Sequence, residues 1–242
     1  MPSPLVRAVA LSKIVQSGDA PLTILDAVAF DIDARETVAI AGASGSGKTT
    51  LLGLLAGLDD PTSGDVVLDG VSLSTLDQDG RAALRQRLIG FVFQSFQLLP
   101  ALTAQENVML PLELAGAPDA TPRAREWLTR VGLARRTTHY PRQLSGGEQQ
   151  RVAIARAFAG EPKILMADEP TGNLDAVTGD EVAELMFRLN REHGTTLILV
   201  THDAQLAARC ERRLSLAGGK LVADERRAMP HVVGAPRRAA AQ

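Results

Sequence analysis

The stretch GASGSGKTT at residues 42–50 constrains the fold more than any other part of this sequence. It follows the apolar run VAIA and leads into the apolar run LLGLLAGL, so it joins an expected strand to an expected helix. In this context the pattern G-x-x-x-x-G-K-[ST] forms a phosphate-binding loop. The glycines let backbone N–H groups turn towards an anion, and the helix N-terminus adds partial positive charge. The stretch therefore predicts a strand–loop–helix unit that binds a phosphate chain.

Two side chains of this phosphate loop have expected roles in nucleotide chemistry. The ammonium group of Lys48 should reach the β- and γ-phosphates, where it serves both binding and catalysis, and the hydroxyl of Thr49 should bind Mg²⁺. The alternative is an ordinary glycine- and serine-rich turn, which leaves the flanking strand and helix unexplained. The predicted nucleotide contacts in this loop are Gly42, Ala43, Ser44, Gly45, Ser46, Gly47, Lys48, Thr49 and Thr50.

A second apolar stretch, ILMADEP at residues 164–170, brings two carboxylates to the end of an expected buried strand. In a parallel sheet the carboxyl ends of the strands lie at the edge where ligands bind. We therefore expect Asp168 to join the Mg²⁺ shell and Glu169 to orient or deprotonate an attacking water. The alternative, an acidic pair that caps a helix before Pro170, accounts for only one of the two carboxylates.

Apolar strands alternate with helical patterns along much of the chain, which predicts an α/β fold with a mostly parallel sheet covered on both faces. Residues 22–41 read as two strands joined by a polar turn at 33–36, and DVVLDGVSL reads as a β-hairpin. Residues 95–142 contain helical patterns broken by Pro and Gly, and the tail from Gly218 offers one more strand. We expect a nucleotide-binding core with an antiparallel β subdomain at 1–94 and 163–225, a helical subdomain at 95–162 and a flexible tail at 226–242.

The composition of the chain argues against several other classes of protein. A formal net charge of −2 provides no basic field for binding nucleic acid. No apolar run approaches the roughly 18–20 residues that span a bilayer, and the first residues lack the apolar core of a signal peptide. The single cysteine, Cys210, cannot form an intrachain disulfide and fits a reducing compartment. These features predict a cytosolic protein that reaches a membrane only through a partner.

Four further short motifs follow the phosphate loop in a fixed order. Gln94 ends FVFQ, LSGGE occupies residues 144–148, NLD follows ILMADEP, and VTHD occupies residues 200–203. Together with the phosphate loop they resemble the motif set of the ATP-binding-cassette (ABC) ATPases, and the resemblance extends from about residue 5 to residue 223. It implies a P-loop NTPase cassette whose helical subdomain carries LSGGE, the family's signature motif.

The signature motif carries the prediction of a dimer. In the ABC family two cassettes pack head to tail, and the signature of each closes on the nucleotide held by the phosphate loop of the other. The resemblance therefore implies a homodimer around two ATP with Mg²⁺, in which the nucleotide is contacted in trans by Ser145, Gly146, Gly147 and Glu148. A helix entrance capped by Ser145 and Glu148 is compatible with the same residues.

The resemblance also implies roles for single residues. Gln94 senses Mg²⁺ and links to the membrane partner, and Glu169 is the general base. His202 hydrogen-bonds the γ-phosphate, and Asp175 bridges the dimer interface. Val15 is a departure, because many members carry at this point an aromatic ring that stacks on adenine. We expect aliphatic packing against the base there, or packing from elsewhere, and less secure selectivity for adenine over guanine.

Details of the motifs indicate a branch of the family. DEPTGNLD and the glutamate that ends the signature resemble the branch that serves lipoprotein release, macrolide export and the FtsE/FtsX division system, and longer stretches look closest to its YbbA type. This resemblance implies a peripheral ATPase on the cytoplasmic face of the inner membrane, held by a permease like FtsX, MacB or YbbP. ATP hydrolysis would then export or extract a lipophilic substrate. An FtsE-like regulatory ATPase that signals without transport is the alternative.

The stretch FQLLPALTAQENVMLPLEL at residues 96–114 is rich in apolar residues just after Gln94. The ABC family receives the permease at this point, so we expect part of a docking groove here. The alternative is that these side chains form the core of the helical subdomain. The predicted docking residues are Phe96, Leu98, Leu99 and Pro100.

Overall fold

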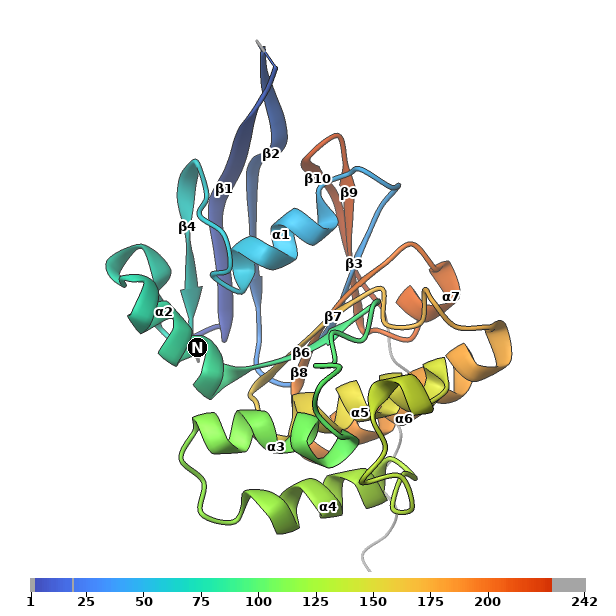
Figure 1. Ribbon diagram of the computed structural model, residues 1–242. Coiled ribbons are helices and arrows are strands. Elements are labelled where there is room, and N and C mark those ends of the chain that lie inside the picture. The colour runs from blue at the N-terminus through green and yellow to red at the C-terminus, as the bar shows by residue number, and fades with distance from the viewer. Residues whose placement is uncertain (1–2, 19, 228–242) are drawn as a thin grey trace, which may run out of the picture.

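A six-stranded sheet forms the centre of the computed structural model, which describes residues 3–18 and 20–227 (Figure 1). Its strand order is β10-β9-β3-β8-β7-β6, and all neighbours are parallel except β10, which runs antiparallel to β9. The strands are β3 (Thr37–Ala41), β6 (Ile89–Phe93), β7 (Ile164–Asp168), β8 (Thr196–Thr201), β9 (Arg212–Ala217) and β10 (Lys220–Arg226). The mostly parallel core expected from the sequence is confirmed.

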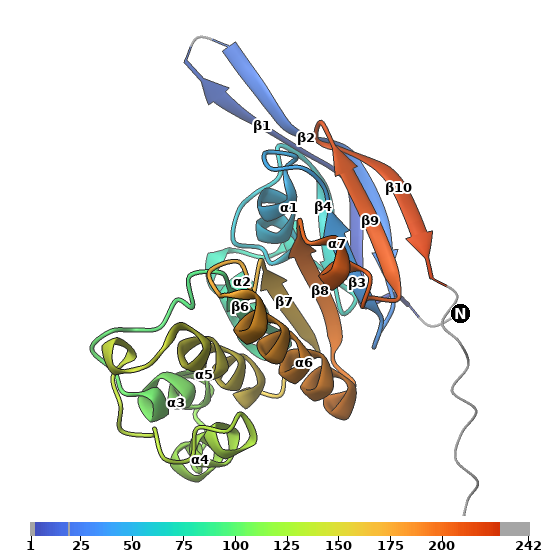
Figure 2. The ribbon, with the colours of Figure 1, turned by 90° about the vertical axis from the view of Figure 1, so that its right-hand side faces the viewer.

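A second, antiparallel sheet has the order β2-β1-β4-β5. Its strands are β1 (Val6–Ser17), β2 (Ala20–Ile32), β4 (Ser63–Leu68) and β5 (Val71–Ser72). The long hairpin of β1 and β2 projects away from the body of the molecule (Figures 1 and 2). The predicted short hairpin is present, and its turn residues Asp69 and Gly70 both have positive φ, as a tight hairpin turn requires. Of the tail expected at 226–242, Arg226 ends β10 and Arg227 is described, and the rest lies outside the described residues.

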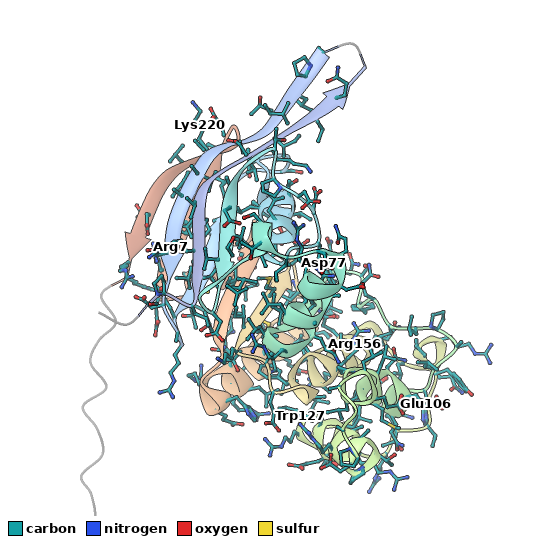
Figure 3. All side chains as sticks on the ribbon, turned by 90° about the vertical axis from the view of Figure 1, so that its left-hand side faces the viewer. Arg7, Asp77, Glu106, Trp127, Arg156 and Lys220 are labelled. Atoms are coloured by element: carbon teal, nitrogen blue, oxygen red, sulfur yellow. The ribbon has the colours of Figure 1, made fainter. Side chains whose placement is uncertain are left out.

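The helices lie on both sides of the central sheet. They are α1 (Lys48–Leu55), α2 (Gln78–Leu88), α3 (Ala104–Leu114), α4 (Ala120–Arg130), α5 (Gly146–Ala159), α6 (Ala176–His193) and the single turn α7 (Ala204–Ala207), with 3₁₀ turns at Leu73–Thr75 and Pro141–Gln143. Helices α3, α4 and α5 fall within residues 95–162 and form a layer at one end, where Figure 3 labels Glu106 and Trp127. Among the described helices, none is long and apolar enough to cross a bilayer.

Two apolar cores lie on opposite faces of the central sheet, as the alternation of side chains along β8 shows. Leu197 and Leu199 belong to a core shared with α3, α4, α5 and α6. Ile198 and Val200 belong to a core shared with α1 and the antiparallel sheet. Because both faces of β8 are covered, all six of its residues are buried. The phosphate loop starts where β3 emerges from between these two cores.

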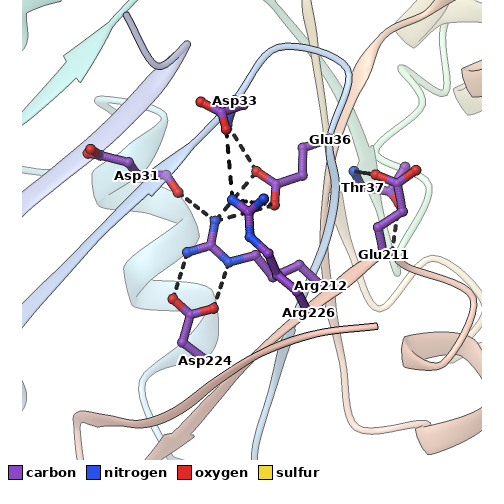
Figure 4. A network of polar contacts seen from close by, with 8 residues as sticks. All are labelled: Asp31, Asp33, Glu36, Thr37, Glu211, Arg212, Asp224 and Arg226. Atoms are coloured by element: carbon purple, nitrogen blue, oxygen red, sulfur yellow. Dashed lines mark hydrogen bonds and ion pairs between the residues drawn. The ribbon is translucent and has the colours of Figure 1, made fainter. Parts of the chain in front are cut away.

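Strand β9 was not expected from the sequence, because it begins with two arginines. Arg212 is only 6 % exposed, yet each of its three guanidinium nitrogens is hydrogen-bonded (Figure 4). It donates to both carboxylate oxygens of Asp224 at 2.6 Å and to the backbone carbonyl of Asp31 at 2.7 Å, and it lies 3.3 Å from Glu36. This network joins the edge strand β10 to the turn between β2 and β3 and lowers the pKa of Asp224 through its bonds to Arg212.

Candidate nucleotide-binding site

The phosphate loop is held by close contacts with the rest of its own chain. Gly47 caps α1 in a left-handed conformation with φ of 97°, and a Cβ there would lie 2.8 Å from the carbonyl oxygen of Ile24. A Cβ on Gly42 would overlap the carbonyl oxygen of Leu216 in β9. The start of α1 has no side-chain cap and no acidic residue in its first turn. Its N–H groups are therefore open to an anion.

Lys48 lies across the loop that it ends. Its ammonium group donates to the carbonyl oxygens of Gly42 and Ala43, both at 2.9 Å, and the residue is only 8 % exposed. An ammonium group has three donors, so one remains after these two bonds. The geometry places a fixed positive charge beside the uncapped helix entrance.

The end of β7 faces the start of α1. The hydroxyl of Thr49 donates to the Asp168 carboxylate at 3.3 Å, and burial is the main cause that raises the pKa of Asp168. Among the described residues, no three His, Cys, Asp or Glu side chains converge as a metal cage. Mg²⁺ usually binds to one or two protein oxygens together with substrate phosphates, and a hydroxyl beside a carboxylate fits that requirement.

Glu169 is held by the end of the neighbouring strand β8. One of its carboxylate oxygens accepts the backbone N–H of His202 at 3.0 Å and lies 2.8 Å from the Nδ1 of that residue. The other accepts the hydroxyl of Thr201 at 3.3 Å. Glu169 also has φ of 46°, a conformation that costs a non-glycine residue about 1–3 kcal/mol. Hydrogen bonds from Thr201 and His202 therefore fix the direction of this carboxylate.

Gln94 is tied to the loop before α6. Its side-chain amide donates to Asn173 Oδ1 at 3.1 Å, and the Asn173 amide donates to the Gln94 carbonyl oxygen at 3.0 Å. Gly172 permits the approach, since a Cβ there would lie 2.8 Å from the Gln94 amide nitrogen. No role for Asn173 is predicted from the sequence, because a pairing across 79 positions leaves no local signal.

A cavity of about 590 Å³ brings most of these groups together. Val15 is not one of its lining residues, whereas Ile24 of β2 is. An adjoining groove of about 390 Å³ shares Glu169 and His202 and includes Asp175, which caps α6 by accepting the N–H of Thr178. The lining residues of the larger cavity are Ile24, Ser44, Gly45, Gly47, Lys48, Thr49, Thr50, Gln94, Glu169 and His202.

The signature motif forms the start of α5 and does not line the phosphate-loop cavity. Ser145 is exposed and accepts the N–H of Glu148 at 3.2 Å, while the Glu148 carboxylate accepts the N–H of Ser145 at 2.9 Å. This capping box lowers the pKa of Glu148, with a smaller contribution from Arg136 at 3.2 Å. Glu148 is therefore an anion at neutral pH, held at the positive end of a helix.

The two glycines of the signature contact the same chain. Gly147 is buried, and a Cβ there would overlap the Thr178 methyl group of α6. A Cβ on Gly146 would lie 3.2 Å from a methyl carbon of Leu174. From the sequence, both glycines are expected to contact a phosphate bound by a partner chain. The structure adds a different requirement for Gly147, which is close packing of α5 against α6.

The segment after Gln94 is fixed by α5. Phe96 and Gln97 have positive φ values of 61° and 51°. Arg156 donates to their carbonyl oxygens at 3.0 and 2.5 Å, respectively. Of the other predicted docking residues, Leu98 packs against the helical core, while Leu99 and Pro100 are exposed.

Comparison with known proteins shows the class that this fold and site define. Residues 25–172 match the family described as ABC transporter. Two solved structures of a bacterial ABC transporter cassette, MJ0796, are 42 % identical to the chain and cover 91 % of it and 98 % of their own chain. One is a dimer with a TM-score of 0.85, and the other a dimer in a post-hydrolysis state bound to ADP and Pi with a TM-score of 0.84. The chain belongs to the ABC transporter family and is an ATP-binding cassette.

Two relatives among known proteins indicate the branch of the ABC transporter family to which this chain is similar. The chain is 57 % identical over 213 residues to the ABC transporter ATP-binding protein YbbA of Escherichia coli K12, covering 87 % of this chain and 93 % of the relative. It is 49 % identical over 219 residues to the lipoprotein-releasing system ATP-binding protein LolD of Bordetella avium, covering 90 % of this chain and 95 % of the relative. The branch expected from DEPTGNLD and the signature glutamate is confirmed.

Proposed function

We propose that two copies of this chain pair around two ATP molecules and hydrolyse them to drive a membrane permease. One observation carries the proposal. The signature residues Ser145 to Glu148 contribute nothing to the cavity around their own phosphate loop, although Gln94, Glu169 and His202 all reach it. The exposed Ser145 at the start of the signature is then available to a second copy. The dimeric structures of MJ0796, at 42 % identity, support this arrangement.

In this proposal the chain's own residues bind the triphosphate and activate water. The open N–H groups of α1 and the remaining Lys48 donor bind the β- and γ-phosphates. Mg²⁺, when bound, neutralises phosphate charge, and the groups that would hold it are Thr49, Asp168 and Gln94. Glu169 accepts a proton from the attacking water, since its carboxylate already has a fixed direction. His202 contacts Glu169 through Nδ1, which leaves its other ring nitrogen for the γ-phosphate.

The permease would dock beside the predicted docking residues. None of these four residues lines the neighbouring groove of about 320 Å³, but Gln97, which lies between Phe96 and Leu98 in the sequence, does. The groove is also lined by Arg156 and by apolar residues of β6 and α3, among them Phe91, Phe93, Leu110, Pro111 and Leu114. Leu114 is strongly exposed. Because Leu98 packs against the helical core, Leu99→Ser and Leu114→Ser are the cleaner test variants. We expect both to lose co-purification with the permease from membranes, and Val222→Ser on the edge strand β10 to retain it.

The proposed transported substrate is inferred from the branch of the family to which the relative LolD belongs. The relative LolD is described as part of a lipoprotein-releasing system, which supports a lipophilic substrate taken from the membrane. Docking to a permease would also place this chain at the cytoplasmic face of the inner membrane. Affinity purification of the tagged chain from membranes, followed by ATPase assays with and without the captured permease, tests both statements. A chain found only with soluble partners contradicts them.

The central test uses Glu169→Gln. Loss of a general base slows hydrolysis by roughly 100- to 10,000-fold, while ATP binding is retained. We expect this variant to accumulate as an ATP-bound dimer of twice the 25.7 kDa chain mass, measured by light scattering after gel filtration. The double variant Glu169→Gln/Ser145→Arg should bind ATP and remain monomeric. Normal hydrolysis by Glu169→Gln, or a dimer in the double variant, would refute the proposed site.

A further inference from the structure

Strands β6 and β7 stop pairing just before two groups of the candidate site. Their last paired positions are Phe93 and Asp168, and the next residues along the two strands are Gln94 and Glu169. The pairing of the strands therefore does not itself fix the distance between these two residues. Glu169 also has φ of 46°, and a non-glycine residue keeps such a conformation only where the surrounding structure supports it. The backbone around Glu169 needs support from another element.

A buried amide of α5 joins the two strand ends. Gln150 is 0 % exposed, and its side-chain nitrogen donates to the carbonyl oxygen of Phe93 at 3.2 Å and to that of Pro170 at 2.5 Å. Phe93 directly precedes Gln94 in the sequence. Pro170, which is also buried, directly follows Glu169. One side-chain nitrogen thus bridges the segments that carry both groups.

Gln150 belongs to the helix that begins with the signature motif. It lies four residues after Gly146 and three after Gly147, so the three residues share one face of α5. Gly147 packs on this face against Thr178 of α6. A phosphate that a second copy brings to the start of α5 would therefore lie about one helical turn from the bridging amide.

We propose that Gln150 is a positioning residue for hydrolysis, which holds the Glu169 carboxylate at a set distance from Gln94 and links this position to the signature helix. The inference rests on the proposed function, because it needs Glu169 to act on the attacking water. A shift of about 1 Å at a reacting group can slow catalysis by about 100-fold. The side-chain hydrogen bonds of Gln150 go to Phe93 and Pro170 and not to the phosphate loop, whose residues are all described, so nucleotide binding should not depend on them.

The first experiment compares Gln150→Met with a matched control, Asn190→Leu. Methionine keeps the length of the side chain and removes both donors. Asn190 is also a buried amide, 3 % exposed, and its side-chain nitrogen donates to the Thr195 carbonyl oxygen at 2.5 Å in the last turn of α6. We expect Gln150→Met to lower the kcat of ATP hydrolysis by about 10- to 100-fold and to leave the dissociation constant of ATP within about twofold. Asn190→Leu should change neither quantity.

A second variant covers the case in which methionine does not fold. Gln150→Asn keeps a buried amide but ends one methylene short of the two carbonyl oxygens, so it should also lower kcat without weakening ATP binding. Circular dichroism and urea unfolding identify the folded variants. A native kcat in either folded Gln150 variant overturns the inference. An equal loss of kcat in Asn190→Leu also overturns it, because Gln150 would then support only the fold.

The second experiment tests whether Gln150 acts through Glu169. In Glu169→Gln the carboxylate to be positioned is gone, so adding Gln150→Met should slow the residual hydrolysis by less than about twofold. Independent contributions multiply, so a further loss of about 10-fold or more in the double variant overturns the inference. Native hydrolysis by Glu169→Gln alone means that the proposed function has failed. Slow hydrolysis by Glu169→Gln together with a native rate for Gln150→Met means that only the role of Gln150 is wrong.

Discussion

The two glycine-rich helix entrances of this chain use the same local chemistry but are completed in different ways. At α1 the N-cap is Gly47, with left-handed backbone, no side-chain cap and no acidic residue in the first turn. At α5 the N-cap is Ser145, with extended backbone and a complete capping box with Glu148. One entrance therefore leaves its N–H groups open, and the other satisfies part of them with its own side chains.

This difference indicates which of the two helix entrances can bind a phosphate in a single chain. The entrance of α1 lies beside the Lys48 ammonium group, so its charge and open N–H groups favour a phosphate chain without a second copy. The entrance of α5 has the ionised Glu148 carboxylate beside it, which offsets the positive end of the helix. We infer that the phosphate loop binds nucleotide in the monomer, whereas the signature contributes only when a second copy brings a phosphate to it.

The largest expected contrast comes from changing each entrance alone. Lys48→Ala removes a charged donor from the phosphate loop and should weaken ATP binding by about 10- to 100-fold. Ser145→Arg should leave ATP binding to the monomer within about twofold and abolish the ATP-dependent dimer, because the phosphate loop of the same chain is untouched. Titration calorimetry and light scattering measure the two effects. Equal loss of ATP affinity in both variants would break the comparison.

The next contrast concerns the packing of the signature. Gly147→Ala forces a methyl group onto that of Thr178 and should reduce the free energy of unfolding by about 1–3 kcal/mol. Adding Thr178→Ser removes the opposing methyl group and should restore much of the loss, as urea unfolding of the four proteins in the cycle would show. If Gly147→Ala is as stable as the native protein but cannot dimerise with ATP, then a partner's phosphate is the only requirement for this glycine.

A smaller effect should follow from removing the negative charge of Glu148 in the signature. Glu148→Gln keeps a capping box but removes the negative charge at the start of α5, so ATP-dependent dimerisation should tighten by about two- to fivefold. Glu106 provides a matched control, because it forms the same capping box with Thr103 at the start of α3. Glu106→Gln should leave dimerisation unchanged. An equal change in both variants would mean that the charge acts through stability and not through the signature.

The smallest effect is a pH dependence of stability shared by the two capping boxes. Hydrogen bonds from Ser145 and Thr103 lower the pKa values of Glu148 and Glu106 below their ordinary value. A lowered pKa in the folded state stabilises the protein above the ordinary glutamate value of about 4.3, and this stabilisation is lost as the pH falls through the folded value. Either glutamine variant should therefore show a flatter loss of stability below about pH 4.3 than the native protein in acid-titrated urea unfolding. An unchanged slope would contradict the capping geometry.

The elements that were predicted correctly have local signals. The phosphate loop, the strands β7 and β8 and the hairpin at Asp69 each have their apolar run and turn residues in one short stretch. Three elements lack such a signal. Strand β1 contains bulges against β2, α2 buries only Leu84 and Leu88, and β9 begins with an arginine that is buried only because distant carboxylates pair with it.

The same division applies to the candidate site. Residues at strand ends could be predicted because the run before them fixes where they lie. The partners that hold the site could not, since Gln94 pairs with Asn173, and Arg156 with the carbonyls of Phe96 and Gln97, across 59 to 79 positions. The contact between Gly147 and Thr178 depends on how two helices cross, and no spacing in either helix reveals it.

Helix α5 has one further consequence. Its first turn carries the surface that we propose for a second copy, and its Arg156 holds the segment that we propose for the permease. Ten residues separate these points, which corresponds to about 15 Å of continuous helix. If closure of the proposed dimer tilts α5, the bonds of Arg156 would carry that tilt to the segment that we propose for the permease. Chemistry and mechanical work would then be linked by one piece of backbone.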